Sequence, residues 1–137
     1  MNKETVLIDS SIWVDYFNKT RATTTNKVQT LISENQAVIN PIIRLEILSG
    51  AKSRKQFNNL SDFLLGLSSL TIDKKVYDHA EKLRFQMRKS GFTISLPDVL
   101  IASTAIIFNC SLLHHDEHFD LIARYYPELK NLTQTDP

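Results

Sequence analysis

Four acidic residues stand where apolar segments of this sequence end or where the next segment begins. They are Asp9 in VLIDSSIW, Glu46 in IRLEILSG, Asp98 in LPDVLIAS and Asp116 in LLHHDEHF. Carboxylates that converge repel one another strongly unless a divalent cation neutralises their charge. Hard cations prefer oxygen ligands, and such sites commonly act on phosphate oxygens. The pattern therefore predicts a Mg²⁺ or Mn²⁺ site.

The segments between these acids predict the elements that bring them together. Short apolar runs predict strands at 5–9, 37–41, 69–73, 110–116 and 129–133. Helical spacing of apolar residues predicts helices at 11–18, 22–34, 42–51, 53–67, 74–91, 96–109 and 117–126. This alternation predicts one α/β domain over residues 1–137, with a mainly parallel sheet covered on both faces. The carboxyl ends of its strands form the crevice where we expect the acids to meet.

Each acid also has a purely structural interpretation. Asp9 and Asp116 are plausible helix N-caps, although the two serines after Asp9 could cap the first helix and leave that carboxylate free. Glu46 is compatible with an exposed position on a helix, and Asp98 with a helix start, where the helix dipole favours an anion. The joint pattern is the informative observation, because all four acids fall at the same kind of topological position.

Three histidines near the last acid suggest a zinc cluster. His114 and His115 are adjacent, so on a strand they point to opposite faces and do not readily bind one metal ion. No HExxH motif and no nearby cysteine accompanies them or His118, which argues against zinc, although one of them could line the pocket and contact a phosphate. Asp120, four residues after Asp116, is a second-tier candidate on the same helix face.

Composition restricts the class of protein. The chain has 137 residues, 42% of them hydrophobic, and a net charge of +1, so it suits a globular domain without a strong basic excess. The single Cys110 lies in an apolar stretch and predicts a buried thiol. Without an apolar leader or a membrane-length segment, we expect a cytoplasmic protein. The sequence lacks the GxxxxGK[ST], GxGxxG and GxSxG motifs, which excludes a P-loop and argues against dinucleotide-binding and serine-hydrolase sites.

Four motifs in order resemble the PIN-domain family, specifically VapC-type toxin ribonucleases. LIDSSIWVDYF is similar to the opening strand and helix of that family, and IRLEILSGA to the helix that carries its Glu and trailing Gly. LPDVLIASTA matches a D-x-x-I-A-x-x-A pattern that begins at Asp98. LLHHDEHF resembles the last motif, an Asp followed three residues later by Phe. Two positions differ, because His114 stands where the family often has Thr, and His115 where it often has a basic residue.

The resemblance implies a Rossmann-like α/β/α fold and an endoribonuclease that depends on Mg²⁺ or Mn²⁺. It implies that Asp9, Glu46 and Asp98 are direct or water-mediated ligands and that Asp116 completes the site. The metal would activate a water for in-line displacement at an RNA phosphodiester. Ser10 or Ser11 could orient a ligand, and a basic cluster could guide the RNA backbone, namely Arg44, Lys52, Arg54 and Lys55.

The resemblance also implies a homodimer and inhibition by a small antitoxin protein. We expect this partner to bury apolar residues near Trp13 and Phe17 and to place an Arg or Lys among the acids. The alternative function is a catalytically weak PIN-fold module that binds RNA or protein. A third interpretation, a phospho-accepting switch, has only Asp73 and Lys130 as crude candidates. Metal binding separates the first two, because a pure binding module does not need it.

Overall fold

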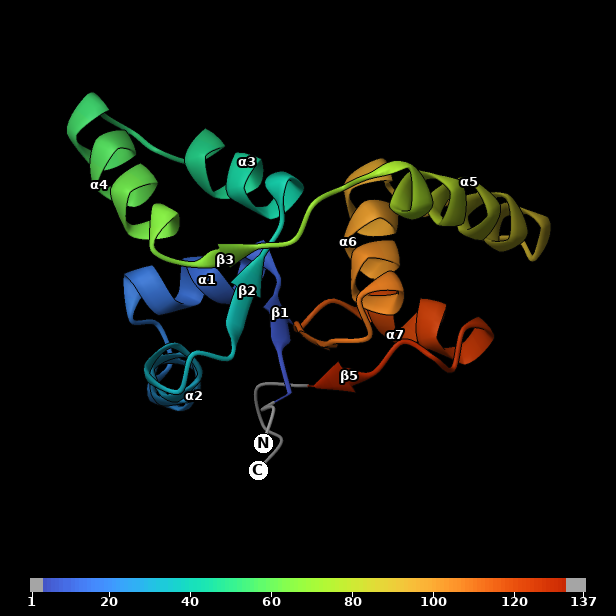
Figure 1. The fold of residues 1–137 in the computed structure, drawn as a ribbon, viewed down its shortest axis with the longest axis horizontal. Coiled ribbons are helices and arrows are strands. Elements are labelled where there is room, and N and C mark those ends of the chain that lie inside the picture. Colours follow the sequence, from blue (N-terminus) through green and yellow to red (C-terminus); the bar gives the residue numbers. More distant parts are fainter. Residues whose placement is uncertain (1–3, 133–137) are drawn as a thin grey trace.

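A five-stranded parallel sheet forms the centre of the structure (Figure 1). The structure is a computed structural model that describes residues 4–132. Within this range the strand order is β3-β2-β1-β4-β5, and all four neighbouring pairs are parallel. The strands are β1 (Val6–Ile8), β2 (Ala37–Ile39), β3 (Ser68–Ser69), β4 (Ser111–Leu113) and β5 (Asn131–Leu132). The predicted parallel α/β architecture is confirmed.

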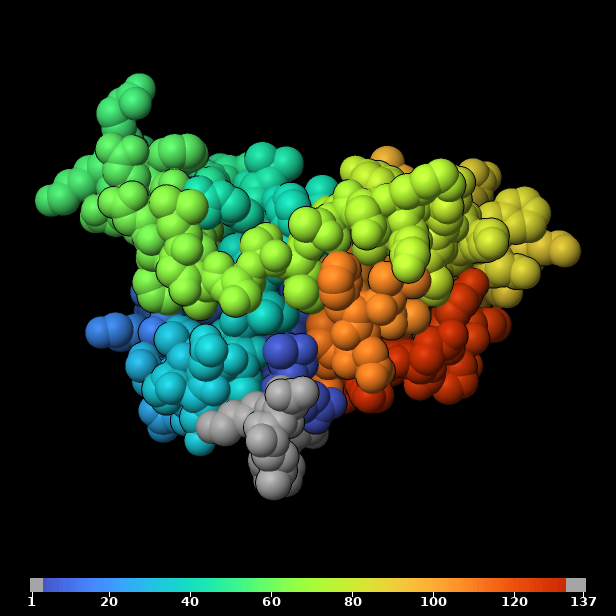
Figure 2. Space-filling model, in the orientation of Figure 1, coloured from blue at the N-terminus to red at the C-terminus, as the bar shows by residue number. Residues whose placement is uncertain are grey.

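Seven helices connect these strands within the described residues. They are α1 (Ser10–Asn18), α2 (Ala22–Ser33), α3 (Pro41–Ser49), α4 (Arg54–Leu65), α5 (Lys74–Lys89), α6 (Leu96–Ile107) and α7 (Glu117–Tyr125). The pair α3 and α4 projects on one side of the molecule and α5 on the other (Figures 1 and 2). In the described part of the chain, no helix is long and apolar enough to cross a membrane.

The three inner strands explain why the sheet needs helices on both faces. Every residue of β1, β2 and β4 is buried, so these strands are continuously apolar or small rather than alternating. A strand buried on both faces requires a covering layer on each, as in parallel sheets generally. The hydrophobic core combines strand residues with inward residues of α1, α3, α5, α6 and α7, and the fold is the three-layer α/β/α arrangement.

The prediction of a third strand over residues 69–73 is wrong in its extent. Strand β3 contains only Ser68 and Ser69, both exposed at the sheet edge. One further backbone bond, from Leu70 N to Ile39 O at 2.7 Å, ends the pairing. The chain then turns away because the carboxylate of Asp73 accepts a hydrogen bond from Val76 N and caps α5. The predicted strand at 129–133 is shorter as well, and its last residue lies outside the described residues.

Asn40 fixes the start of the helix that carries Glu46. Its side-chain oxygen accepts a hydrogen bond from Ile43 N at 2.8 Å, and Pro41 occupies the first helical position, where no N–H is needed. Its amide nitrogen donates to Thr104 Oγ1 at 3.0 Å, and Asn40 is completely buried. This bond joins the start of α3 to α6, the two helices that carry Glu46 and Asp98.

Candidate metal centre

Asp9 follows β1 directly and is buried, with only 5% of its surface exposed. Its Oδ2 atom accepts hydrogen bonds from the backbone N of Ser11 at 3.3 Å and from Ser11 Oγ at 2.5 Å. Asp9 is therefore itself the N-cap of α1, and the expectation that a following serine performs this role is wrong. A cap and a metal ligand are compatible, because a carboxylate has two oxygens and about four lone-pair directions.

Glu46 lies on α3 and reaches the same strand ends. Ser10 Oγ donates a hydrogen bond to Glu46 Oε1 at 3.0 Å, so the first residue of α1 orients this carboxylate. Partial desolvation raises the pKa of Glu46, the bond from Ser10 opposes this shift, and the charges of Asp9 and Asp98 raise the pKa further. The carboxylates of Asp9, Glu46 and Asp98 thus lie close enough to repel one another.

Asp98 occupies the first turn of α6. Ser95 caps this helix by accepting a hydrogen bond from Asp98 N at 3.3 Å, and the Asp98 carboxylate contacts Nδ1 of His118 on α7. Burial is the largest cause of its raised pKa, followed in the same direction by the charges of Asp116 and Asp9. A hydrogen bond with His118 acts in the opposite direction. Of the four predicted acids, only Asp98 and Asp116 offer ligand atoms within 4.8 Å of each other, whereas Asp9 and Glu46 lie outside that group.

Asp116 caps α7 after β4 and is held from both sides. Its Oδ1 atom accepts a hydrogen bond from His118 N at 2.9 Å. Its own backbone N donates to Nδ1 of His114 at 3.0 Å. His114 is buried, and burial lowers its pKa. A neutral ring that accepts at Nδ1 carries its proton on Nε2, which lies 3.6 Å from Asp120 Oδ1.

The three histidines have different partners. The predicted strand over 110–116 is shorter than expected, because β4 ends at Leu113, so His114 and His115 lie beyond the strand and not on its two faces. His115 Nε2 lies 3.3 Å from Asp15 Oδ2 on α1. His118 Nδ1 lies 3.4 Å from Asp98 Oδ2 and 3.6 Å from Asp116 Oδ1. Asp120 is exposed beside His114 and the Asn131 amide. Of the candidates on α7, His118 has the more direct contact with the acids.

Sequence reasoning missed Asn40 in this site, and it considered His118 only as one of three histidines that could line the pocket. Asn40 could have been found from its place between a strand and a proline, which is typical of a helix N-cap. His118 had a weaker signal, its position two residues after Asp116 at a helix start. Among the described residues, Asp98, Asp116 and His118 offer ligand atoms that all lie within 4.8 Å of one another. Such a set of oxygen and nitrogen donors fits a divalent cation.

Comparison with known proteins agrees with this arrangement. A family model of the PIN domain matches residues 6–125. The chain is 37% identical over 123 residues to "Ribonuclease VapC11" of Mycobacterium tuberculosis, which covers 87% of this chain and 92% of that protein. It is 29% identical over 121 residues to "Ribonuclease VapC1" of Methanocaldococcus jannaschii, covering 88% and 82%.

Solved structures give the same result. The structure of VapBC2 from Rickettsia felis, bound to a DNA fragment from its promoter, matches with a TM-score of 0.78 at 26% identity. That match covers 94% of this chain and 98% of the other. The chain therefore belongs to the PIN domain family. Its relatives are named as VapC ribonucleases and its structural neighbours come from VapBC complexes, as the four sequence motifs predicted.

Proposed function

We propose that this protein is a single-domain endoribonuclease of the cytoplasm and the toxin of a toxin–antitoxin pair. The observation that carries the proposal is the group formed by Asp98, Asp116 and His118, whose ligand atoms lie within 4.8 Å of one another, beside Glu46, whose pKa is raised by burial and by the charges of Asp9 and Asp98. Membership of the PIN domain family and relatives named as ribonucleases support the choice of RNA.

The four carboxylates would hold Mg²⁺ or Mn²⁺ and would set the position of the scissile phosphate. A bound cation would supply a Lewis acid that activates water and stabilises the departing oxygen in an in-line displacement. Ser10 and Ser11 orient Glu46 and Asp9 through their hydroxyls. His114 orients Asp116 by accepting a hydrogen bond from its backbone.

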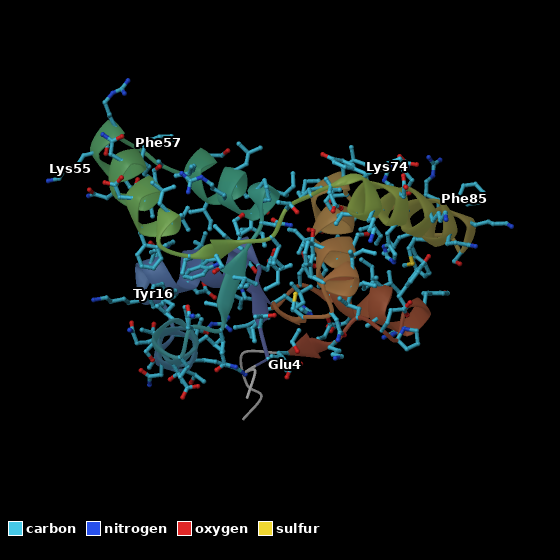
Figure 3. All side chains as sticks on the ribbon, in the orientation of Figure 1. Glu4, Tyr16, Lys55, Phe57, Lys74 and Phe85 are labelled. Atoms are coloured by element: carbon cyan, nitrogen blue, oxygen red, sulfur yellow. The ribbon has the colours of Figure 1, made fainter. Side chains whose placement is uncertain are left out.

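Basic residues near α3 and α4 provide a path for the RNA backbone. Lys52, Arg54 and Lys55 are exposed at the junction of the two helices, and Lys55 extends outward from α4 (Figure 3). Arg44 differs from them, because its guanidinium donates to Ser61 Oγ at 2.8 Å and joins α3 to α4. We therefore assign Arg44 a structural role and the other three a role in phosphate contacts.

Sequencing of cellular RNA ends after brief expression tests the function. We expect the intact protein to create new RNA ends at defined positions, and Asp9→Asn to create none, because it removes an anionic ligand with little change in volume. Equal amounts of both proteins must be present, as measured by immunoblot. The same new ends in the Asp9→Asn sample would contradict the proposed function.

We also propose a binding groove for the antitoxin between α1 and α4. The groove has a volume of about 490 Å³, and the rings of Phe17 and Phe63 lie 5.4 Å apart in its wall. Trp13, near which we expect the partner to bind, is itself completely buried, so Phe17 and not Trp13 lines the groove. Trp13 instead packs beneath both rings, and its ring centre lies 5.8 Å from that of Phe17 and 5.9 Å from that of Phe63.

We expect Phe63→Glu to prevent co-purification of a small protein encoded beside this chain. A charge in the centre of an apolar interface commonly costs about 2 kcal/mol or more, which weakens binding by about 30-fold. Phe57→Glu is the matched control, because Phe57 is also exposed on α4 but does not line this groove. Thermal melting of both variants checks the fold, and Phe63→Ala repeats the test if Phe63→Glu does not fold. Full retention of the partner by a folded Phe63 variant would refute the groove.

A second copy of the chain is the partner we propose for the opposite side of the molecule. Tyr77, Phe85 and Leu96 are exposed around an apolar groove of about 470 Å³ between α5 and α6. Phe85 lies on α5, far from the proposed antitoxin groove (Figure 3). The groove also contains Arg84, Arg88 and Glu81, so a two-fold axis can bring opposite charges together. The mass of the purified protein in solution, measured by light scattering, tests this proposal.

A further inference from the structure

His118 lies among the candidate ligands and has no role in the function proposed above. It is the second residue of α7, where its backbone N donates to Asp116 Oδ1 at 2.9 Å. This bond places its side chain over the same carboxylate, with Nδ1 3.6 Å from Asp116 Oδ1. Across the site, Nδ1 lies 3.4 Å from Asp98 Oδ2. The imidazole thus faces one acid on α6 and one at the start of α7.

These separations match those of ligands that share one cation. Two ligands at adjacent corners of an octahedron with bonds of about 2.1 Å are about 3.0 Å apart. The separations of 3.4 Å and 3.6 Å exceed this value by only a few tenths of an ångström. A small rotation of the His118 side chain, more than half of which is exposed to solvent, is enough to close this difference.

We propose that His118 is a protein ligand of the cation, through Nδ1, and that it makes the site select Mn²⁺ over Mg²⁺. The inference rests on the metal site of the proposed function and adds a nitrogen donor to it. Mg²⁺ strongly prefers oxygen ligands, whereas imidazole binds transition metals well. One histidine among several carboxylates therefore favours Mn²⁺, which accepts both kinds of donor.

His115, in the segment between β4 and α7, provides a control. His115 also follows β4 and is partly exposed, but its Nε2 faces Asp15 on α1, 3.3 Å away. Its removal deletes one imidazole that lies beside a carboxylate, as removal of His118 does. Of these two histidines, His118 is the one that contacts the carboxylates of Asp98 and Asp116. A difference in Mn²⁺ affinity between His118→Ala and His115→Ala therefore reports on the position of His118 and not on the loss of an imidazole in general.

Mn²⁺ binding to the purified protein tests the proposal without any RNA. Electron paramagnetic resonance measures free Mn²⁺ during a titration, and electron spin echo modulation detects a ¹⁴N nucleus bonded to Mn²⁺. We expect ¹⁴N coupling in the intact protein and in His115→Ala, and none in His118→Ala. We also expect His118→Ala to weaken Mn²⁺ binding by about tenfold or more, with a smaller change for Mg²⁺ measured by competition.

The variant His118→Asp gives an independent check. It replaces the nitrogen with an oxygen at the same position, so we expect metal binding to be retained and the preference to move toward Mg²⁺. An intact protein without ¹⁴N coupling, or equal Mn²⁺ affinity in His118→Ala and His115→Ala, would overturn the assignment. If Mn²⁺ binds through His118 and no RNA is cut, the ligand assignment stands and the proposed activity fails.

Discussion

Asp98→Asn is expected to reduce RNA cleavage by the purified protein by about 10³-fold or more. A bound cation supplies several kcal/mol of transition-state stabilisation, and each 1.36 kcal/mol corresponds to about tenfold in rate. Asp98 faces Asp116 and His118 within the group that offers ligands to one ion, so its loss removes a central member. Initial rates on one RNA substrate with saturating Mg²⁺ or Mn²⁺ measure the effect. Asp62→Asn, an exposed position on α4, is the control with unchanged rates.

The same variant is expected to melt at a higher temperature than the intact protein when both are free of metal. Burial and the charges of Asp116 and Asp9 raise the pKa of Asp98 in the folded state. A carboxyl whose folded pKa lies above its unfolded value, about 3.9, destabilises the fold as pH rises through the interval between the two values. The increase in melting temperature of Asp98→Asn over the intact protein should therefore be complete at about pH 7 and smaller near pH 4.

Melting curves at both pH values, recorded in a chelator, test this linkage. In excess Mn²⁺ the intact protein should melt at a higher temperature than Asp98→Asn, because the cation binds the intact site more strongly and stabilises that protein by mass action. Cleavage by Asp98→Asn at the rate of the intact protein would disprove the site. A lower melting temperature of the metal-free variant at about pH 7 would mean that hydrogen bonds of Asp98 outweigh the repulsion.

Chelation is expected to abolish cleavage completely, and Mg²⁺ or Mn²⁺ to restore it better than Zn²⁺. Most candidate ligands are carboxylate oxygens, which suit hard cations that bind several ligands and waters. Zn²⁺ prefers four-coordinate sites with nitrogen and sulfur ligands. The adjacent His114 and His115 do not supply such a site, because His114 contacts Asp116 N and His115 faces Asp15. Cleavage of labelled RNA after EDTA treatment, followed by addition of each ion, measures the recovery.

Two controls separate loss of the ion from loss of the protein. EDTA with an excess of Mg²⁺ should leave the rate unchanged, and the chelated protein should still melt cooperatively. The cooperative melt is expected because none of the four acids belongs to the hydrophobic core, and Asp9, the one of them that is buried, remains hydrogen-bonded by Ser11. Undiminished cleavage in excess chelator would refute a metal mechanism and would direct attention to His114 and His118 as acid–base groups.

The sequence was sufficient to predict the order of elements and the place of the acids. Buried parallel strands give continuous apolar runs, and their ends are marked by the first polar residue, as at Asp9 after β1 and His114 after β4. The extent of β3 could not be predicted, because residues 69–73 resemble a strand locally. Pairing with β2 and the cap at Asp73 decide where it ends.

Contacts between distant segments account for the other errors and omissions. The bond from Asn40 to Thr104 crosses 64 positions of the sequence, so no local pattern reveals it. The burial of Trp13 depends on Phe63 of α4, fifty residues later. The contact of His118 with Asp98 likewise depends on how α6 and α7 pack. The sequence therefore predicted which acids to consider, but it could not predict which other side chains, such as His118, lie beside them.

The central position of β1 has a consequence for synthesis of the protein. Its neighbours are β2, which follows early in the chain, and β4, which is made about a hundred residues later. A nascent chain can pair β1 with β2 but cannot add Asp98 and Asp116 until α6 and β4 have left the ribosome. Translation proceeds at about 5–20 residues per second, so the incomplete acid cluster persists for several seconds. During that interval the chain on the ribosome carries only half of the cluster, and the proposed antitoxin would have time to meet it before the site is complete.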